Sequence, residues 1–344
     1  MRPFAYARAD SAEAAIHAHS AEHVPPDAPS VLAPSQYIAG GTNMTDYMKL
    51  DVVRPERLTD INLLHKTPSG EIEFGPRGLW LGALVRMAEA ADHPDVYVNY
   101  PVIAQSLQLA ASAQIRNMAS LGGNVLQRTR CAYFRDVTYG ECNKRKPGSG
   151  CAAMDGFNRR HAILGVSDQC IASYAGDFAQ ALIALDAQVE IAGTEDTRTI
   201  PFADLHRPLG DTPQIETTLK PGELIMAFLV PSLPWAKRSL FLKVRDRESY
   251  EFALTSAAVA LDMDGDTVRE ARIALGGVST LPWRARQAEE QLNGKTLDDS
   301  SLGAAAEAAF AEAKPRKHNA FKVELGKLTL VRALRQAASM EVSP

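Results

Sequence analysis

Hydrophobic and polar positions along the chain follow two periods, one typical of helices and one typical of strands. Apolar residues recur at helical spacing in residues 11–22, 44–50, 82–92, 101–113, 178–185, 285–293 and 303–313, which predicts helices there. Short apolar or alternating runs predict strands at residues 37–39, 71–74, 79–81, 188–192, 239–244, 257–263 and 268–275. This mixture indicates an α+β fold.

Two interruptions of the pattern suggest how the chain is divided. Residues 231–234 begin and end with proline and read as a linker between an N-terminal domain (1–230) and a C-terminal domain (236–340). Within the first domain, residues of about 127–170 form an irregular insert that contains Pro147-Gly148-Ser149-Gly150. We expect this insert to bury little and to depend on a bound group for its order.

Composition and charge exclude several classes of protein. The chain has 344 residues, 46% of them hydrophobic, and its 37 basic and 41 acidic residues nearly cancel, which argues against a nucleic-acid binder. Lys144-Arg145-Lys146 is too short for a nucleic-acid patch and is interpreted as a solvated loop or a contact for an acidic partner. The sequence has no apolar run of about 18 residues, the length that a membrane span requires, so no span is predicted. Because the first ten residues lack the apolar core of a secretory signal, we expect a cytoplasmic protein, or a periplasmic one if a signal-bearing partner subunit exports it.

The cysteines are the most informative residues. The chain has only Cys131, Cys142, Cys151 and Cys170, all inside one window of 40 residues. Disulfides suit small secreted domains, so we favour a metal site with four thiolate ligands. The spacing lacks the Cys-x2-Cys pairs of zinc ribbons and ferredoxins. Spacing alone therefore leaves an iron–sulfur cluster, zinc and unliganded thiols open.

Two glycine pairs predict a binding site for an anion. Gly40-Gly41-Thr42-Asn43 lies between a short strand and a helix, and Ser120-Leu121-Gly122-Gly123-Asn124 is similar in composition. Glycines allow tight turns whose backbone N–H groups bind phosphate. Neither loop is the Gly-x-Gly-x-x-Gly fingerprint, and each alone could be an ordinary turn. Together they favour one shared anionic ligand.

These motifs, in this order, resemble the FAD-binding subunit of the molybdenum hydroxylases. The resemblance rests on the two glycine loops, Ile115-Arg116-Asn117, Asp177 before an Ala- and Leu-rich helix, and the C-terminal segments 241–245 and 274–278. It implies a vanillyl-alcohol-oxidase-type FAD-binding domain of two subdomains, covered by a third, C-terminal domain.

The insert resembles that of the medium subunits of bacterial aldehyde oxidoreductases, in residues 130–136, 142–145 and 147–151. In those proteins the insert carries a 4Fe-4S cluster, so the resemblance implies that the four cysteines are its ligands. His161, which lies inside the insert, could then hydrogen-bond a ligand sulfur.

The resemblance also implies a set of FAD contacts. These are Ala39, Gly40, Gly41, Thr42, Asn43, Met44, Ser120, Leu121, Gly123, Asn124, Asp177 and Lys243. Asp177 could instead be an ordinary helix N-cap, and Lys243 could simply face solvent. Because the glycine loops lie mostly outside the insert, we expect FAD binding to survive loss of the cluster.

The function that follows is electron transfer, with no catalytic residue in this chain. The resemblance implies a heterotrimer in which a large subunit holds molybdopterin and oxidises aldehydes to carboxylic acids. A small subunit would hold 2Fe-2S clusters and pass electrons to FAD and on to an external acceptor. The alternatives are a subunit of the 4-hydroxybenzoyl-CoA reductase or xanthine dehydrogenase type, and a zinc-stabilised scaffold without redox chemistry.

Overall fold

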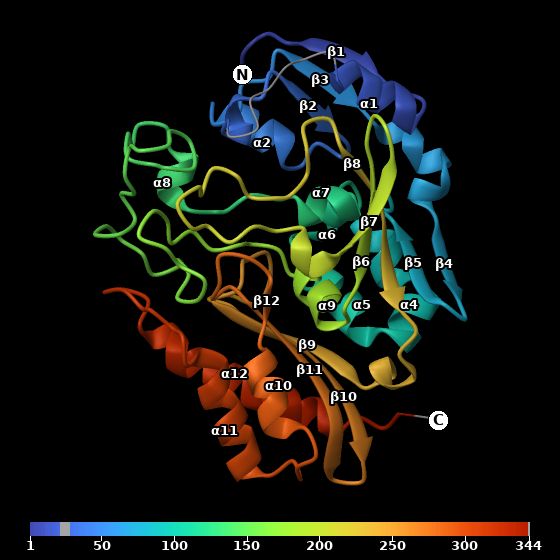
Figure 1. Ribbon diagram of the computed structural model, residues 1–344, viewed down its shortest axis with the longest axis vertical. Helices are drawn as coiled ribbons and strands as arrows, with labels where there is room; N and C mark the ends of the chain where they lie inside the picture. The colour runs from blue at the N-terminus through green and yellow to red at the C-terminus, as the bar shows by residue number, and fades with distance from the viewer. Residues whose placement is uncertain (21–27, 343–344) are drawn as a thin grey trace.

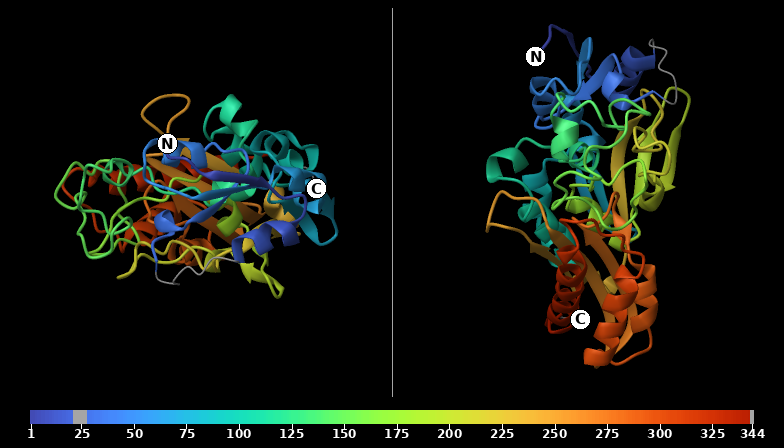
Figure 2. Two further views of the ribbon diagram at one scale, coloured as in Figure 1. Left: turned by 90° about the horizontal axis from the view of Figure 1, so that it is seen from above. Right: turned by 90° about the vertical axis from the view of Figure 1, so that its left-hand side faces the viewer.

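The computed structural model describes residues 1–20 and 28–342. Within these residues the strands form three sheets, stacked along the long axis of the molecule from the N-terminal unit at the top of Figure 1 to the C-terminal unit at the bottom. The right-hand view of Figure 2 shows the same stacking from the side. None of the described helices combines the length and the apolarity that crossing a bilayer requires.

The N-terminal sheet is small and parallel. Its order is β1-β3-β2, with β1 (Ala5–Arg8), β2 (Ser35–Ile38) and β3 (Arg57–Asp60). Parallel neighbours need crossover connections, and the helices α1 (Ala12–Ser20) and α2 (Met44–Lys49) lie in these connections. The helix expected at 11–22 therefore forms, while residues 21 and 22 lie outside the described part of the chain. Strand β2 ends directly before the first glycine pair.

The central sheet has the order β4-β5-β8-β6-β7 and is antiparallel. Its strands are β4 (Ile72–Gly75), β5 (Gly78–Gly82), β6 (Gln188–Ala192), β7 (Thr197–Pro201) and β8 (Leu224–Pro231). Between β5 and β6 the chain forms α3 (Met87–Asp92), α4 (Pro94–Asn99), α5 (Pro101–Gln108), α6 (Ala113–Arg116), α7 (Leu121–Val125), α8 (Ala132–Arg135) and α9 (Phe178–Ala184). The helix expected at 101–113 is shorter because Ala111 adopts φ +48°, which ends helical geometry.

The C-terminal sheet has the order β12-β11-β10-β9. Its strands are β9 (Ser239–Val244), β10 (Thr255–Asp264), β11 (Thr267–Gly276) and β12 (Trp283–Arg284), and the helices after them are α10 (Arg286–Leu292), α11 (Asp299–Phe310) and α12 (Phe321–Ala338). Alternate residues of β10 serve two cores: Ala258 and Ala260 join the core of the N-terminal domain, while Val259 and Leu261 join the core with α10–α12. The sheet is therefore covered on both faces.

The insert is better packed than the sequence suggests. Phe134, Ala153 and Asn158 are almost completely buried, and Ile163 and Leu164 belong to the core of the C-terminal domain. The N–H groups of Ile163 and Leu164 donate to the carbonyl oxygen of Val278 at 2.8 and 3.0 Å. The expectation that the insert buries little is wrong, because its second half packs against the C-terminal domain. Figure 1 shows the first half of the insert, with α8, as the lobe on the left.

Candidate functional site

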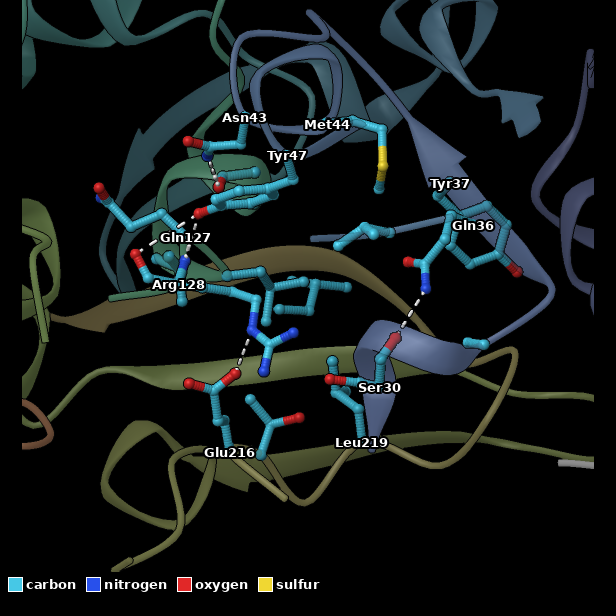
Figure 3. A pocket seen from close by; sticks show the side chains of 18 of the residues that line it. Ser30, Gln36, Tyr37, Asn43, Met44, Tyr47, Gln127, Arg128, Glu216 and Leu219 are labelled. Carbon is cyan, nitrogen blue, oxygen red and sulfur yellow. Dashed lines mark hydrogen bonds and ion pairs between the residues drawn. The ribbon is translucent and has the colours of Figure 1, made fainter. Parts of the chain in front are cut away.

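A cavity of about 440 Å³ separates the N-terminal sheet from the central domain. Both glycine loops line it, together with residues from the long connection between β7 and β8. Figure 3 shows Asn43, Met44 and Tyr47 on one side and Glu216 and Leu219 on the other, with Arg128 reaching between them. The structure thus brings the two glycine loops to one space.

Glycine is required at position 40 by close packing and at position 41 by backbone geometry. A Cβ at Gly40 would lie 1.8 Å from the carbonyl oxygen of Met118, which no side chain could avoid. Gly41 adopts φ +72°, in the left-handed region. Among the described residues, no acceptor is found for the backbone N–H groups of Gly41, Thr42 and Asn43. These neighbouring donors on the cavity wall suit a phosphate group.

The second loop contributes shape rather than free donors. Ser120 caps α7, its Oγ accepting the N–H of Gly123 at 3.2 Å. The N–H groups of Leu121 and Gly122 already donate to the carbonyl oxygens of Val85 and Ala83. Leu121 and Asn124 do not line the cavity, whereas Ser120 and Gly123 do. These N–H groups of the second loop are therefore already bonded within the protein, and the sequence alone does not reveal these internal bonds.

A charged group on the cavity wall has no signature in the sequence. Glu216 accepts hydrogen bonds from Arg128 Nε at 2.5 Å and Lys144 Nζ at 2.7 Å. Burial alone would raise the pKa of Glu216, but the two cations outweigh it and lower this pKa to about 2. Burial lowers the pKa of the neighbouring His206 to about 4, so its imidazole is neutral at pH 7.

Three buried polar atoms of cavity-lining residues have no partner within the described chain. They are Arg128 Nη2, His206 Nε2 and Gln214 Oε1. Unpaired buried groups of this kind are costly, which suggests that a ligand or water satisfies them. These residues were missed because they form no local pattern: Arg128 lies 78 and 86 positions before His206 and Gln214.

Asp177 and Lys243 form a buried ion pair away from the cavity wall. Lys243 Nζ lies 2.6 Å from Asp177 Oδ2 and 3.0 Å from the carbonyl oxygen of Leu109. The Lys243 side chain is 1% exposed, so the alternative that it faces solvent is wrong. Asp177 stands at the N-cap position of α9 but makes no capping hydrogen bond. Burial raises the pKa of Asp177 despite the nearby Lys243. A contact of either residue with FAD stays a prediction.

The cysteines converge although they are far apart in the chain. Cys142 and Cys151 pair across a short antiparallel bridge, and Cys151 and Cys170 lie close enough that their interaction lowers the pKa of Cys151 and raises that of Cys170. The charges of Cys142 and Cys151 act on Cys131, whose pKa burial raises to about 12. All four are free thiols. The insert therefore gathers its thiols in one region.

Hydrogen bonds to sulfur surround this region. His161 Nε2 lies 3.1 Å from Cys131 Sγ, as the sequence suggests, and the N–H of Ala172 donates to Cys170 Sγ at 3.4 Å. Such bonds are typical of thiolate ligands. However, the described residues contain no group of three or more Cys, His, Asp or Glu side chains placed to hold a single metal ion.

The basic run beside the cysteines is internal rather than solvated. Lys144 is buried against Glu216, and Arg145 donates to the carbonyl oxygens of Tyr133, Phe134, Asp136 and Tyr139. Only Lys146 of the three is exposed. The interpretation of 144–146 as a solvated loop or partner contact is therefore wrong for Lys144 and Arg145.

Comparisons with known proteins agree with this geometry. The family model of the FAD binding domain in molybdopterin dehydrogenase matches residues 2–233, and that of the CO dehydrogenase flavoprotein C-terminal domain matches residues 241–337. The chain is 45% identical over 341 residues to the aldehyde oxidoreductase FAD-binding subunit PaoB of Escherichia coli K12, covering 98% of this chain and 99% of that protein. It is 23% identical over 305 residues to the glyceraldehyde dehydrogenase medium chain of Sulfolobus acidocaldarius, covering 88% and 90%.

Solved structures share the fold. CO dehydrogenase from Oligotropha carboxidovorans superposes with a TM-score of 0.74 at 22% identity, covering 99% of each chain. Quinoline 2-oxidoreductase from Pseudomonas putida 86 gives 0.72 at 23% identity, covering 98% of this chain and 97% of that one. Fold and cavity thus define a flavoprotein with an FAD-binding domain and a C-terminal domain. The chain belongs to the FAD-binding medium subunits of the molybdenum hydroxylase family, which are oxidoreductase subunits.

Proposed function

We propose that the chain is the electron-transfer subunit of a molybdenum-containing aldehyde oxidoreductase and that it binds FAD and one 4Fe-4S cluster. FAD would accept electrons from partner subunits and release them to an external acceptor. The 45% identity to an FAD-binding subunit of an aldehyde oxidoreductase supports aldehydes as the substrate class of the complex. The protein itself contributes binding, spacing and electrostatics, because the redox chemistry belongs to the cofactors.

The residues of the first glycine loop would hold the pyrophosphate of FAD. Gly41, Thr42 and Asn43 line the cavity, and their N–H groups, for which no acceptor is found among the described residues, would be donors to phosphate oxygens. Ser120 and Gly123 would line the cavity beside the first loop, to which they are held by Asn43 Nδ2, which donates to the Gly123 carbonyl oxygen at 3.2 Å. Arg128, His206 and Gln214 offer unpaired polar atoms to other parts of the same ligand.

The convergence of the four cysteines carries the cluster proposal. A 4Fe-4S cube takes one thiolate on each of its four irons. The four cysteines of the chain, brought into one region by the fold of the insert, would supply these thiolates. Hydrogen bonds to Cys131 and Cys170 from His161 and Ala172 would stabilise the negative charge on the sulfurs.

The proposed partners are a molybdopterin-binding large subunit and a small subunit with 2Fe-2S clusters, in a heterotrimer. The aldehyde would be oxidised in the large subunit. In this chain no general base is assigned; the buried carboxylate of Asp177 is already paired with Lys243.

Metal, sulfide and flavin analysis of the purified complex tests the proposal. We expect stoichiometric FAD and one additional 4Fe-4S cluster beyond the 2Fe-2S clusters. Changing any one of the four cysteines to Ser should remove four irons and leave the 2Fe-2S clusters intact. Full iron content in a variant would remove that cysteine from the ligand set, and zinc in place of iron would contradict the cluster.

A further inference from the structure

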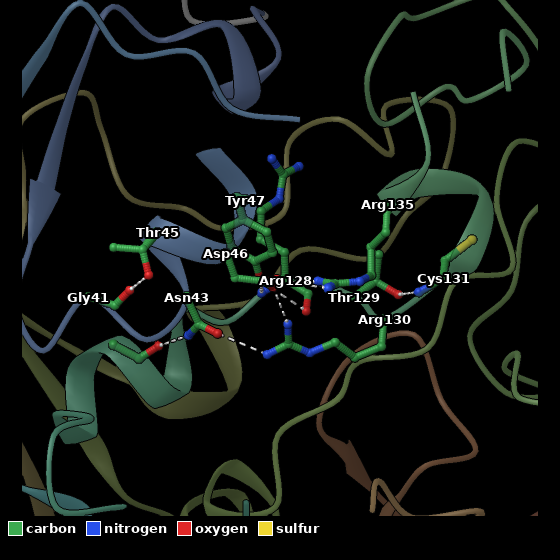
Figure 4. A network of polar contacts seen from close by, with 11 residues as sticks. Gly41, Asn43, Thr45, Asp46, Tyr47, Arg128, Thr129, Arg130, Cys131 and Arg135 are labelled. Atoms are coloured by element: carbon green, nitrogen blue, oxygen red, sulfur yellow. Dashed lines mark hydrogen bonds and ion pairs between the residues drawn. The ribbon is translucent and has the colours of Figure 1, made fainter. Parts of the chain in front are cut away.

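The side chain of Asn43 joins three parts of the protein that are distant in sequence. Its Nδ2 donates to the Gly123 carbonyl oxygen, and its Oδ1 accepts a hydrogen bond from Arg130 Nη2 at 2.9 Å. The bond from Arg130 fixes which end of the amide faces Gly123. Arg130 directly precedes Cys131, so the contact between the glycine loops is completed from the cysteine-bearing insert (Figure 4).

The next turn of α2 makes a second contact with the same segment. Both oxygens of Asp46 accept from Arg135, from Nη1 at 2.7 Å and from Nη2 at 3.0 Å. Arg130 Nη1 also reaches Asp46 Oδ2 at 3.4 Å. The Asp46, Arg130 and Arg135 side chains are only 24–34% exposed, so this paired geometry is shielded from water. Bidentate pairs of this kind fix orientation as well as distance.

A third contact comes from the following residue, Tyr47. Its hydroxyl oxygen accepts the backbone N–H of Arg128 at 2.9 Å, and its ring lies 5.9 Å from the Arg130 guanidinium. Tyr47 is 4% exposed. Residues 43–47 therefore touch residues 128–135, here called the clamp segment, at three positions, 43, 46 and 47.

We propose that Arg130 and Arg135 are positioning residues for FAD, and that FAD binding and the order of the clamp segment are linked. The inference rests on the proposed binding of FAD by the first glycine loop. A ligand that needs residues 41–43 in one arrangement favours the state in which Asn43 and Asp46 are held by the clamp segment. By reciprocity, whatever orders Cys131 also strengthens FAD binding. From the sequence, FAD binding is expected to survive loss of the cluster; the proposed linkage adds that FAD binding is then weakened.

The test is FAD rebinding to the full-length chain in its complex, after FAD has been removed. The variants are Arg130→Gln, which removes the bond to Asn43, and Arg135→Gln, which removes the bidentate pair but leaves Asn43 untouched. Arg130→Lys keeps the charge. Arg54→Gln is the matched control, because Arg54 pairs with Asp51 at 2.7 Å just after α2 and does not contact the clamp segment. Hydrogen exchange of residues 128–136 is measured with and without FAD.

We expect FAD to protect the amides of residues 128–136 in the unmodified protein. Arg130→Gln should weaken FAD binding about tenfold and abolish that protection, Arg135→Gln should do so less strongly, and Arg130→Lys should restore part of the affinity. Arg54→Gln should change neither. Unchanged affinity in both Gln variants, or exchange that FAD does not alter, would overturn the linkage while leaving FAD binding intact. Failure of the unmodified chain to bind FAD would instead contradict the proposed function, and the linkage with it.

Discussion

At the scale of single residues, the first glycine loop requires glycine at position 40, because a Cβ there would overlap a backbone group. Position 40 packs against the Met118 carbonyl group, immediately before the second glycine loop. The absence of a Cβ thus sets the distance between the two glycine loops. The sequence reveals the glycine pair but not this contact, because Met118 is far away along the chain.

Gly40→Ala should therefore push the two loops apart. We expect FAD affinity to fall at least tenfold, since the overlap with a backbone oxygen cannot be relieved by rotating a side chain. Gly75→Ala is the control, because a Cβ at Gly75 has nothing within 4 Å. Flavin content after purification measures the effect, and wild-type FAD content in Gly40→Ala would contradict this role of the glycine.

Glu216 gives a prediction that depends on pH. Its pKa is lowered from 4.5 to about 2 because Arg128 and Lys144 share its carboxylate. A carboxylate with a lowered pKa stabilises the fold above its unfolded pKa, and the stabilisation is lost as the pH falls from about 4.5 to 2.

Glu216→Gln should lower the free energy of unfolding by about 2 kcal/mol at pH 7, with the difference from wild type shrinking toward pH 2. Urea unfolding between pH 3 and 7 checks this. Glu248→Gln serves as the control because Glu248 is exposed. A difference that does not change with pH would show that packing, not charge, explains the effect.

At the scale of elements, the insert depends on one arginine as well as on its cysteines. Arg145 Nη1 donates to the carbonyl oxygens of Tyr133, Phe134 and Asp136 at 2.6, 2.7 and 3.1 Å. These carbonyls belong to α8 and its C-terminal end, where helical carbonyls lack partners. Arg145 thus closes the turn that presents Cys131.

Arg145→Gln should lower the free energy of local opening of residues 132–140 by about 2 kcal/mol, because charged donors to three carbonyls are lost. Hydrogen exchange should rise in that segment while the amides of α5 keep their protection. The neighbouring Lys146 is exposed, so Lys146→Gln should leave exchange unchanged. Equal exchange in the two variants would contradict this role.

Several elements are predictable from the hydrophobic pattern of the sequence, and others, among them β8 and α12, are not. Strands β9, β10 and β11 fall where apolar or alternating runs predict them. Helix α12 was missed because its buried face includes Lys322, Gly326 and Thr329, which break the apolar period. Gly326 lies there because a Cβ would meet the Phe310 ring at 2.2 Å. Strand β8 was missed because the proline at its end suggested a linker.

The site is predictable only as far as it is local. The glycine loops and the cysteines stand out as short motifs or as rare residues in one window. Arg128, His206, Gln214 and Glu216 acquire their roles only when the β7–β8 connection folds over the insert, and no spacing rule brings such residues together.

At the scale of the whole molecule, the proposed division of labour predicts that this chain alone does not oxidise aldehydes. The isolated chain should bind FAD, and dithionite should bleach the flavin absorption, while added aldehydes should leave it oxidised. In the assembled complex, aldehydes should bleach the same flavin. Anaerobic absorption spectra of both samples check this, and aldehyde-dependent bleaching in the isolated chain would contradict the proposed assignment of chemistry to a partner.

The way Ile163 and Leu164 complete the C-terminal core has a consequence for how the protein is made. The partner of their N–H groups, Val278, is synthesised about 115 residues later, which at ~5–20 residues per second takes roughly 6–23 s. During that interval the end of the insert has emerged from the ribosome, but the strands and helices of the C-terminal domain have not. A polypeptide released before residue 278 would expose this apolar pair to chaperones and proteases. Separate expression of two fragments divided at residue 235 should therefore yield fragments that fold only in each other's presence.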